Sequence, residues 1–158
     1  MESYALLIGS TLSAGTVIAL AALGLLVNEK AGIVNLGAEG MMLCAALAGF
    51  ATTVVTGNEW LGFAAGALAG ALLAAVFGVL VIWLNTNQYA TGLALSLFGV
   101  GFSAFAGQNF VQAKLPELAQ DGIPYLRDIP LAGPALFDHD PLVYGAMALA
   151  VALIWFLD

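Results

Sequence analysis

The sequence predicts an all-α, polytopic membrane helix bundle with about five transmembrane segments. Of the 158 residues, 62% are hydrophobic and only 8% are charged, whereas ordinary globular domains are about half apolar and about a quarter charged. The apolar runs are long, continuous and rich in Ala, Leu and Gly, without the alternation of β-barrel strands. This composition excludes a soluble enzyme with a charged surface and a disordered chain. Three basic residues are also too few to bind a nucleic-acid backbone.

The charge-free intervals place the segments along the chain. A helix needs about 20 apolar residues to cross about 30 Å of hydrocarbon. The charge-free interval 60–113 must therefore hold two helices, separated by the polar residues Asn85–Gln88. The first segment is not a signal peptide, because its start is acidic at Glu2 and its apolar run is too long. We expect one membrane domain, 1–158, with spans at about 4–27, 38–57, 60–84, 89–113 and 141–157.

The interval 114–140 is predicted to be an external polar loop. It contains four of the five prolines and five of the ten acidic residues, and prolines disfavour one long helix. The loop is either simply solvated or a docking surface for a soluble partner. Lys30 favours a cytoplasmic position for the 28–30 turn, which places the N-terminus and the loop outside. The lone His139 in this loop is interpreted as solvated rather than as a metal ligand.

Small residues recur at helical spacing in the third and fourth spans. In lipid the apolar attraction between helices is weak, so small residues that let two backbones approach drive helix packing. The pattern predicts that these positions are packed, either within one subunit or between subunits. The predicted packing residues are Gly62, Gly66 and Gly70 in the third span, and Gly99 and Ser103 in the fourth.

The stretch from Asn28 to Met42 is the most polar region between two apolar spans. Asn35 and Glu39 are four residues apart and share a face on any helical path, and Glu39 is expected to be buried in protein or to face a water-filled cavity. Three glycines interrupt the stretch, and broken segments of this kind build transporter sites. The alternative is an interfacial turn in which Glu39 caps a helix N-terminus. The glycines are Gly32, Gly37 and Gly40.

No motif predicts catalysis, a metal site or a bound cofactor. Cys44 is the single cysteine, which excludes an internal disulfide and a cysteine-based metal cage. The sequence contains no Walker loop for ATP and no protease or hydrolase motif. Any energy for transport would therefore come from an ion gradient or from another subunit.

Three stretches of the chain have a recognisable pattern: Leu23–Leu43, Asn87–Gly101 and Ile129–Tyr144. They resemble permease subunits of ABC importers, in the branch that carries nucleosides and simple sugars and that is related to the ribose and branched-chain amino acid permeases. The most specific is LGLLVNEKAGIVNLGAEGMML, Leu23–Leu43. The others are NQYATGLALSLFGVG, Asn87–Gly101, and IPLAGPALFDHDPLVY, Ile129–Tyr144. The resemblance covers most of the chain in order. The family continues past the last helix with an arginine-rich segment and further spans, so we expect this chain to be the N-terminal half of such a permease.

The resemblance implies a membrane-spanning subunit in a bacterial or archaeal plasma membrane, embedded in the lipid bilayer and without enzymatic activity of its own. Its implied partners are a second permease subunit, ABC ATPase subunits that hydrolyse the ATP, and an extracytoplasmic substrate-binding protein. We take Asn35, Glu39, Asn87 and Gln88 as candidate residues of the substrate path. The alternatives are a small membrane scaffold or assembly subunit and an ion-coupled carrier. The carrier is disfavoured because Glu39 is the sole plausible titrating group within the membrane.

Overall fold

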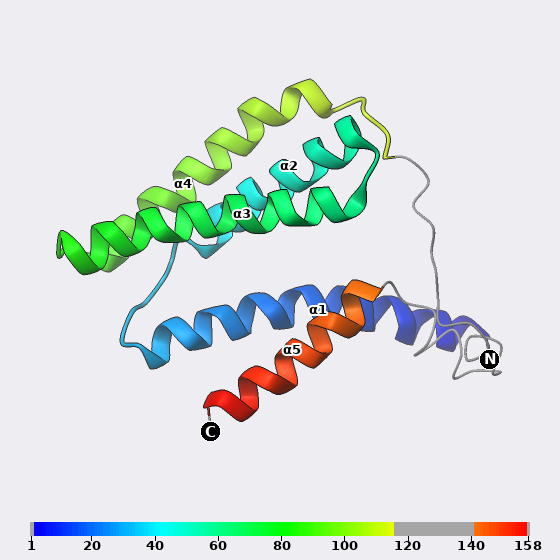
Figure 1. The fold of residues 1–158 in the computed structure, drawn as a ribbon, viewed down its shortest axis with the longest axis horizontal. Helices are drawn as coiled ribbons and strands as arrows, with labels where there is room; N and C mark the ends of the chain where they lie inside the picture. The colour runs from blue at the N-terminus through cyan, green and yellow to red at the C-terminus, as the bar shows by residue number, and fades with distance from the viewer. Residues whose placement is uncertain (1, 116–140, 158) are drawn as a thin grey trace. The chain divides into compact units, whose positions relative to one another are not determined.

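A computed structural model describes residues 2–115 and 141–157, and every regular element in these ranges is a helix (Figure 1). The prediction of an all-α fold is therefore confirmed. The predicted loop 114–140, including His139, lies outside the described residues from 116 onward. The elements are α1 (Glu2–Lys30), α2 (Ala38–Thr56), α3 (Glu59–Gly78), the π-helix η1 (Val79–Trp83), α4 (Gln88–Gly107), the 3-10 turn η2 (Gln108–Phe110) and α5 (Pro141–Leu157).

Four of the described helices are long and apolar enough to cross a membrane, and α5 contains a shorter apolar helix, Val143–Phe156. Each of the five expected segments is a helix, which confirms the polytopic helical bundle. The helix bounds lie within a few residues of the expected ones. The four candidate spans are Leu7–Lys30, Ala38–Thr56, Glu59–Trp83 and Gln88–Phe110.

The helix ends have local chemical causes. Gly32 ends α1 with a φ of 81°, a left-handed conformation that suits glycine. The N–H of Gly32 donates to the carbonyl of Glu29, and that of Ile33 donates to Asn28, both at 2.9 Å. This pair of hydrogen bonds is the Schellman arrangement at a helix C-terminus. The glycine break predicted near the second span thus falls before α2, which is itself continuous.

Two asparagines begin the next helices. The Asn58 side chain accepts hydrogen bonds from the N–H groups of the first turn of α3, and Asn87 does the same for α4. Such N-caps satisfy backbone donors that have no partner within the helix. Between η1 and α4, the chain turns at Asn85, whose φ is 50°. Thr86 closes this turn, because its N–H and hydroxyl both donate to the Leu80 carbonyl, at 3.1 and 2.9 Å.

The chain forms two compact units, Met1–Val27 with Ala119–Asp158, and Asn28–Leu118. Within the second unit, α2 packs against both α3 and α4, which contact each other little. Cys44 and Thr53 are buried on α2, and Phe77 is buried on α3. Most large apolar side chains remain exposed. A membrane helix bundle presents such a surface to lipid, whereas a soluble monomer rarely does.

Candidate functional site

The polar stretch before α2 is a non-helical segment, 31–37, that joins α1 to α2. The Asn35 Oδ1 atom accepts a hydrogen bond from the Gly37 N–H at 2.9 Å, and its Nδ2 atom lies 3.8 Å from the Met41 sulfur. The side chain thereby shapes the turn into α2. Because α2 begins at Ala38, Asn35 is not helical, and the expectation that it shares a helical face with Glu39 is wrong.

Glu39 lies in the first turn of α2, and its side chain is exposed. The expectation that protein buries it is therefore wrong for this chain. The capping alternative agrees in part: Glu39 lies at the N-terminus of α2, but the N-cap is Gly37 and no side chain forms a cap hydrogen bond there. A carboxylate in a first turn is still favoured by the helix dipole. Glu39 is thus an exposed negative charge in the first turn of α2.

Gln88 links this segment to α4. Its Oε1 atom accepts a hydrogen bond from the Val34 N–H at 3.0 Å, across 54 residues of sequence. Gln88 is half-buried, whereas Asn87 is exposed and caps α4. Of the four candidate path residues, the structure thus brings Asn35 and Gln88 to one place, where segment 31–37 meets the start of α4. Asn87 borders that place, and Glu39 lies in the first turn of α2.

Glycines allow the close approach of α2 and α4 at this site. A Cβ atom on Gly92 would lie 2.9 and 3.0 Å from the backbone nitrogens of Leu36 and Gly37. One on Gly40 would lie 2.6 Å from the Ser96 Cα, and one on Gly99 would overlap the Gly40 backbone. Gly40, which we expected to interrupt the helix, therefore lies inside α2, where it contacts α4.

The glycines predicted on the third span face α2. A Cβ on Gly62 would collide with the Thr53 side chain, and one on Gly66 would lie 2.9 Å from the Ala45 carbonyl oxygen. The equivalent distance at Gly70 is an ordinary 3.6 Å, to the Ala45 Cβ. On α4, Ser103 is half-buried, and its hydroxyl donates to the Val100 carbonyl of its own helix.

The sequence analysis missed the residues of α2 and α4 that complete these contacts. Helix α2 has one face of small residues toward α3 and another toward α4. The spacing rule of three to four residues that we applied to the third span would have found both faces. The missed residues are Gly40, Ala45, Gly49 and Thr53 on α2, and Gly92 on α4.

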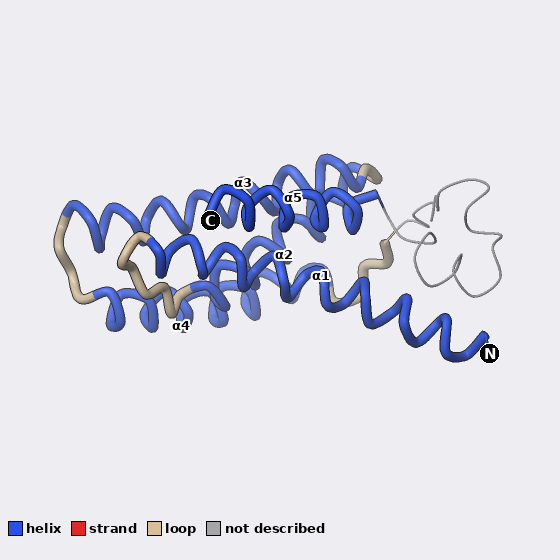
Figure 2. Tube along the Cα trace, turned by 90° about the horizontal axis from the view of Figure 1, so that it is seen from below, coloured by secondary structure: helices blue, strands red, loops and turns tan. Residues whose placement is uncertain are grey.

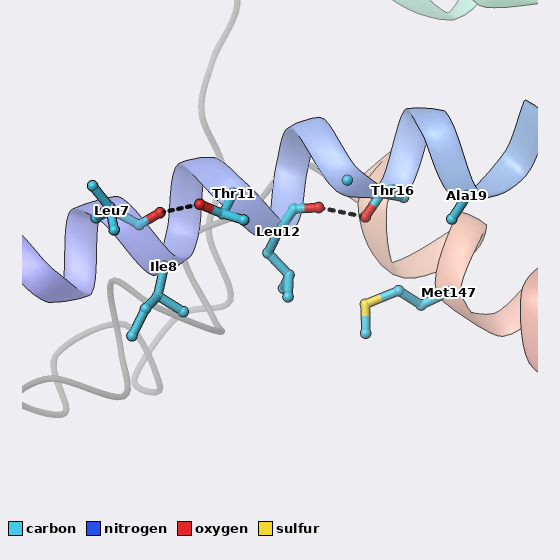
Figure 3. A pocket seen from close by; sticks show the side chains of 8 residues that line it. Leu7, Ile8, Thr11, Leu12, Thr16, Ala19 and Met147 are labelled. Carbon is cyan, nitrogen blue, oxygen red and sulfur yellow. Dashed lines mark hydrogen bonds between the residues drawn. The ribbon is translucent and has the colours of Figure 1, made fainter.

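A separate pocket lies in the first unit, between α1 and Met147 of α5 (Figure 3). The hydroxyls of Thr11 and Thr16 in its wall donate to the Leu7 and Leu12 carbonyls, both at 2.7 Å, so the pocket is apolar. None of the candidate path residues lines it. Its lining is Leu7, Ile8, Thr11, Leu12, Gly15, Thr16, Ala19 and Met147.

A comparison with known protein families shows to which family the chain belongs. A profile described as "Branched-chain amino acid transport system / permease component" matches residues 7–158. The chain belongs to this permease family. The match covers almost all of the chain, which is consistent with the resemblance that Leu23–Leu43 indicated.

Three relatives with names are similar to this member of the family. A Haloferax volcanii protein, provisionally named glucose ABC transporter permease protein TsgC13, is 45% identical over 99% of this chain and 48% of its own length. The guanosine ABC transporter permease protein NupQ of Bacillus subtilis is 29% identical over 99% of this chain and 53% of its own. The nucleoside ABC transporter permease protein NupC of Lactococcus lactis is 26% identical over the same shares.

The permease chain thus spans about half the length of the curated relatives it matches. No solved structure matches it. Family membership and the four candidate spans together identify a multi-pass membrane protein.

Proposed function

We propose that the protein acts as a membrane-spanning permease subunit of an ATP-driven importer for nucleosides or simple sugars. The observation that carries this proposal is the family match over residues 7–158. Relatives named as glucose and nucleoside permeases align along nearly the whole chain and support the substrate class. We place the protein in a bacterial or archaeal plasma membrane, as one membrane domain with its N-terminus and 114–140 outside.

Its proposed partners are a second permease subunit, ABC ATPase subunits and an extracytoplasmic substrate-binding protein. The sequence contains no nucleotide-binding loop of the Walker type, so the proposal assigns ATP hydrolysis to separate subunits. The chain contributes helices and a path, and the partner subunits contribute energy and substrate capture.

We assign part of the translocation path to segment 31–39 together with the start of α4. The polar groups here are amide side chains and non-helical backbone. Asn35 shapes the turn into α2, and Gln88 holds the Val34 N–H. Uncharged hydrogen-bonding groups suit neutral, hydroxyl-rich solutes, and Glu39 adds one carboxylate nearby. Broken segments that expose backbone groups are a recurrent way to build transporter sites.

Uptake by variants of the full-length transporter tests this assignment. We expect Glu39→Leu and Asn35→Leu to lower the uptake rate about tenfold or more, because both remove polar groups from the path. Glu39→Gln should keep much of the rate, since it retains shape and hydrogen bonding. The measurement is uptake of radiolabelled nucleoside or glucose at matched membrane expression.

Glu59 provides the control for helix-terminus effects. It is also an acidic residue in the first turn of its helix, α3, but lies at the opposite end of the second unit. Glu59→Leu therefore loses the same dipole interaction, about 0.3–1 kcal/mol, without touching segment 31–39. Uptake near the unmodified rate in both Glu39→Leu and Asn35→Leu would remove these residues from the path. Equal losses in Glu39→Leu and Glu59→Leu would assign the effect to helix stability.

A further inference from the structure

Exposed aromatic side chains lie at the start of α3, at the end of η1 and at the start of α4. Trp60 is 56% exposed at the start of α3, and Trp83 and Tyr89 are 79% and 51% exposed beside the turn into α4. The basic residues of this unit, Lys30 and Lys114, lie before α2 and after α4, so within α2, α3 and α4 these aromatic residues mark the headgroup region. Trp60 and Trp83 are separated by about 35 Å of helix, close to the thickness of a bilayer. The turn at 84–87 therefore marks one membrane interface.

Segment 31–37 lies at the same end of the unit but further in (Figure 2). On α4, Gly92 abuts the backbone of Leu36 and Gly37, and at 1.5 Å per residue Gly92 is about 6 Å from the start of that helix. On α3, Gly70 meets Ala45. Measured from that contact toward the end where α2 begins, Trp83 is about 20 Å away along α3, and Gly37 is about 12 Å away along α2. The first estimate, along α4, and the second, the difference between the lengths along α3 and α2, place Leu36 and Gly37 roughly 6–8 Å inside the interface.

The backbone at this depth is not helical and is only partly hydrogen-bonded. The Val34 and Gly37 N–H groups have side-chain acceptors, whereas those of Asn35 and Leu36 have none in the described ranges 2–115 and 141–157. The Leu36 side chain is 43% exposed, and Glu39, in the first turn of α2, is exposed as well. In hydrocarbon, such backbone and such a carboxylate are tolerated only inside protein or beside water.

We propose that segment 34–37 and Glu39 line a water-filled vestibule that enters the membrane by one to two helical turns at the end where α2 and α4 begin. Within the second unit, α4 covers one side of the segment, and the exposed carboxylate of Glu39 marks the wet side. The vestibule rests on the proposed function as the mouth of the translocation path, but water access is measurable without any transport.

Nitroxide labels in the full-length polypeptide, reconstituted in liposomes, test the proposal. The single cysteine is first removed by Cys44→Ala, and labels are attached to Leu36→Cys and Glu39→Cys. The controls are Val76→Cys on α3 and Leu93→Cys on α4, which lie near the same depth and are 48% and 54% exposed. The readout is the ratio of relaxation by a water-soluble nickel chelate to relaxation by oxygen, which concentrates in lipid.

We expect the ratio to favour the nickel chelate at 36 and 39, and to favour oxygen at both controls, with a difference of about tenfold between the two groups. A ratio that favours nickel at the controls would place this level outside the hydrocarbon and overturn the proposal. An oxygen-favouring ratio at 36 and 39 would mean that lipid or dry protein covers the segment, which overturns it equally.

Hydrogen exchange on the unsubstituted protein provides a second measurement that needs no cysteine. The amides of Asn35 and Leu36 should exchange in deuterated water within the shortest labelling time. The amides of 95–100, inside α4, should stay protected. Equal protection of the two segments would contradict the vestibule. Neither readout depends on the uptake rate of Glu39→Leu. An unchanged uptake rate in that variant would therefore overturn the transport assignment alone, and contrary label and exchange results would overturn the vestibule alone.

Discussion

Helix α1 and the α2–α4 unit both contain glycines, but their glycines do different things. A Cβ atom added to Gly15 or Gly24 of α1 would have nothing within 4 Å among the described residues. Gly62, Gly66 and Gly99 each face the backbone or side chain of a neighbouring helix at contact distance or closer. The comparison teaches that a glycine in a membrane helix matters through what lies opposite it.

The physical reason is the weak apolar attraction between helices in lipid. Packing must come from close van der Waals contact, which small residues allow. Where the opposite group is backbone, it cannot rotate away from an added methyl group. A graded set of Gly→Ala changes therefore measures the contacts one by one.

The largest effect is expected at Gly99, because an added Cβ overlaps the Gly40 backbone. Gly99→Ala should separate α2 from α4 and lower the free energy of unfolding by about 3 kcal/mol. Thermal unfolding in detergent measures this. The control is Gly101→Ala, two residues along α4, where nothing lies within 4 Å. Equal melting temperatures for the two variants would show that the α2–α4 contact is misplaced.

An intermediate effect is expected at Gly66, where the added Cβ lies 2.9 Å from the Ala45 carbonyl oxygen. Gly66→Ala should cost about 1–2 kcal/mol, because the helices must shift by a few tenths of an ångström. Gly70→Ala, at an ordinary 3.6 Å, should cost clearly less in the same unfolding measurement. A reversed order would mean that α3 is rotated relative to α2.

The smallest effect, and one of opposite sign, is expected at Gly15. With open space around it, Gly15→Ala should raise helix stability by about 0.5–1 kcal/mol, since alanine loses less backbone freedom than glycine. Circular dichroism during thermal unfolding detects this change. Destabilisation instead would indicate that a further helix or subunit packs against this face of α1.

The helices were predictable from sequence because long apolar runs and asparagine-capped turns are local features. The small-residue pattern of the third span was local too, so Gly62 and Gly66 were found. Which residues lie opposite them was not predictable, because one sequence does not say which helices meet. Gly40 was mistaken for a helix breaker for that reason, since its partner Gly99 lies far along the chain.

In the candidate site, too, local features were predictable from the sequence and contacts between distant segments were not. The polar composition of 28–42 and 85–88 was visible in the sequence. The hydrogen bond from the Val34 N–H to Gln88 was not, because it depends on the fold. The sequence left open whether Glu39 is buried or interfacial, because a carboxylate between apolar runs fits both positions until the neighbouring helices are placed.

The central position of α2 has a consequence for biosynthesis. Ribosomes make α2 before either helix that covers it, so its two glycine-lined faces first meet lipid or the insertion machinery. Its mean hydropathy of 1.6, against 2.5 for the third span, makes it a weak candidate for independent insertion. The more apolar α3 follows after a two-residue connection and can bring α2 into the membrane as a hairpin. Nascent chains arrested at a length at which α3 has left the ribosome and α4 has not should therefore show the α2–α3 contact by cross-linking, before α4 enters the membrane.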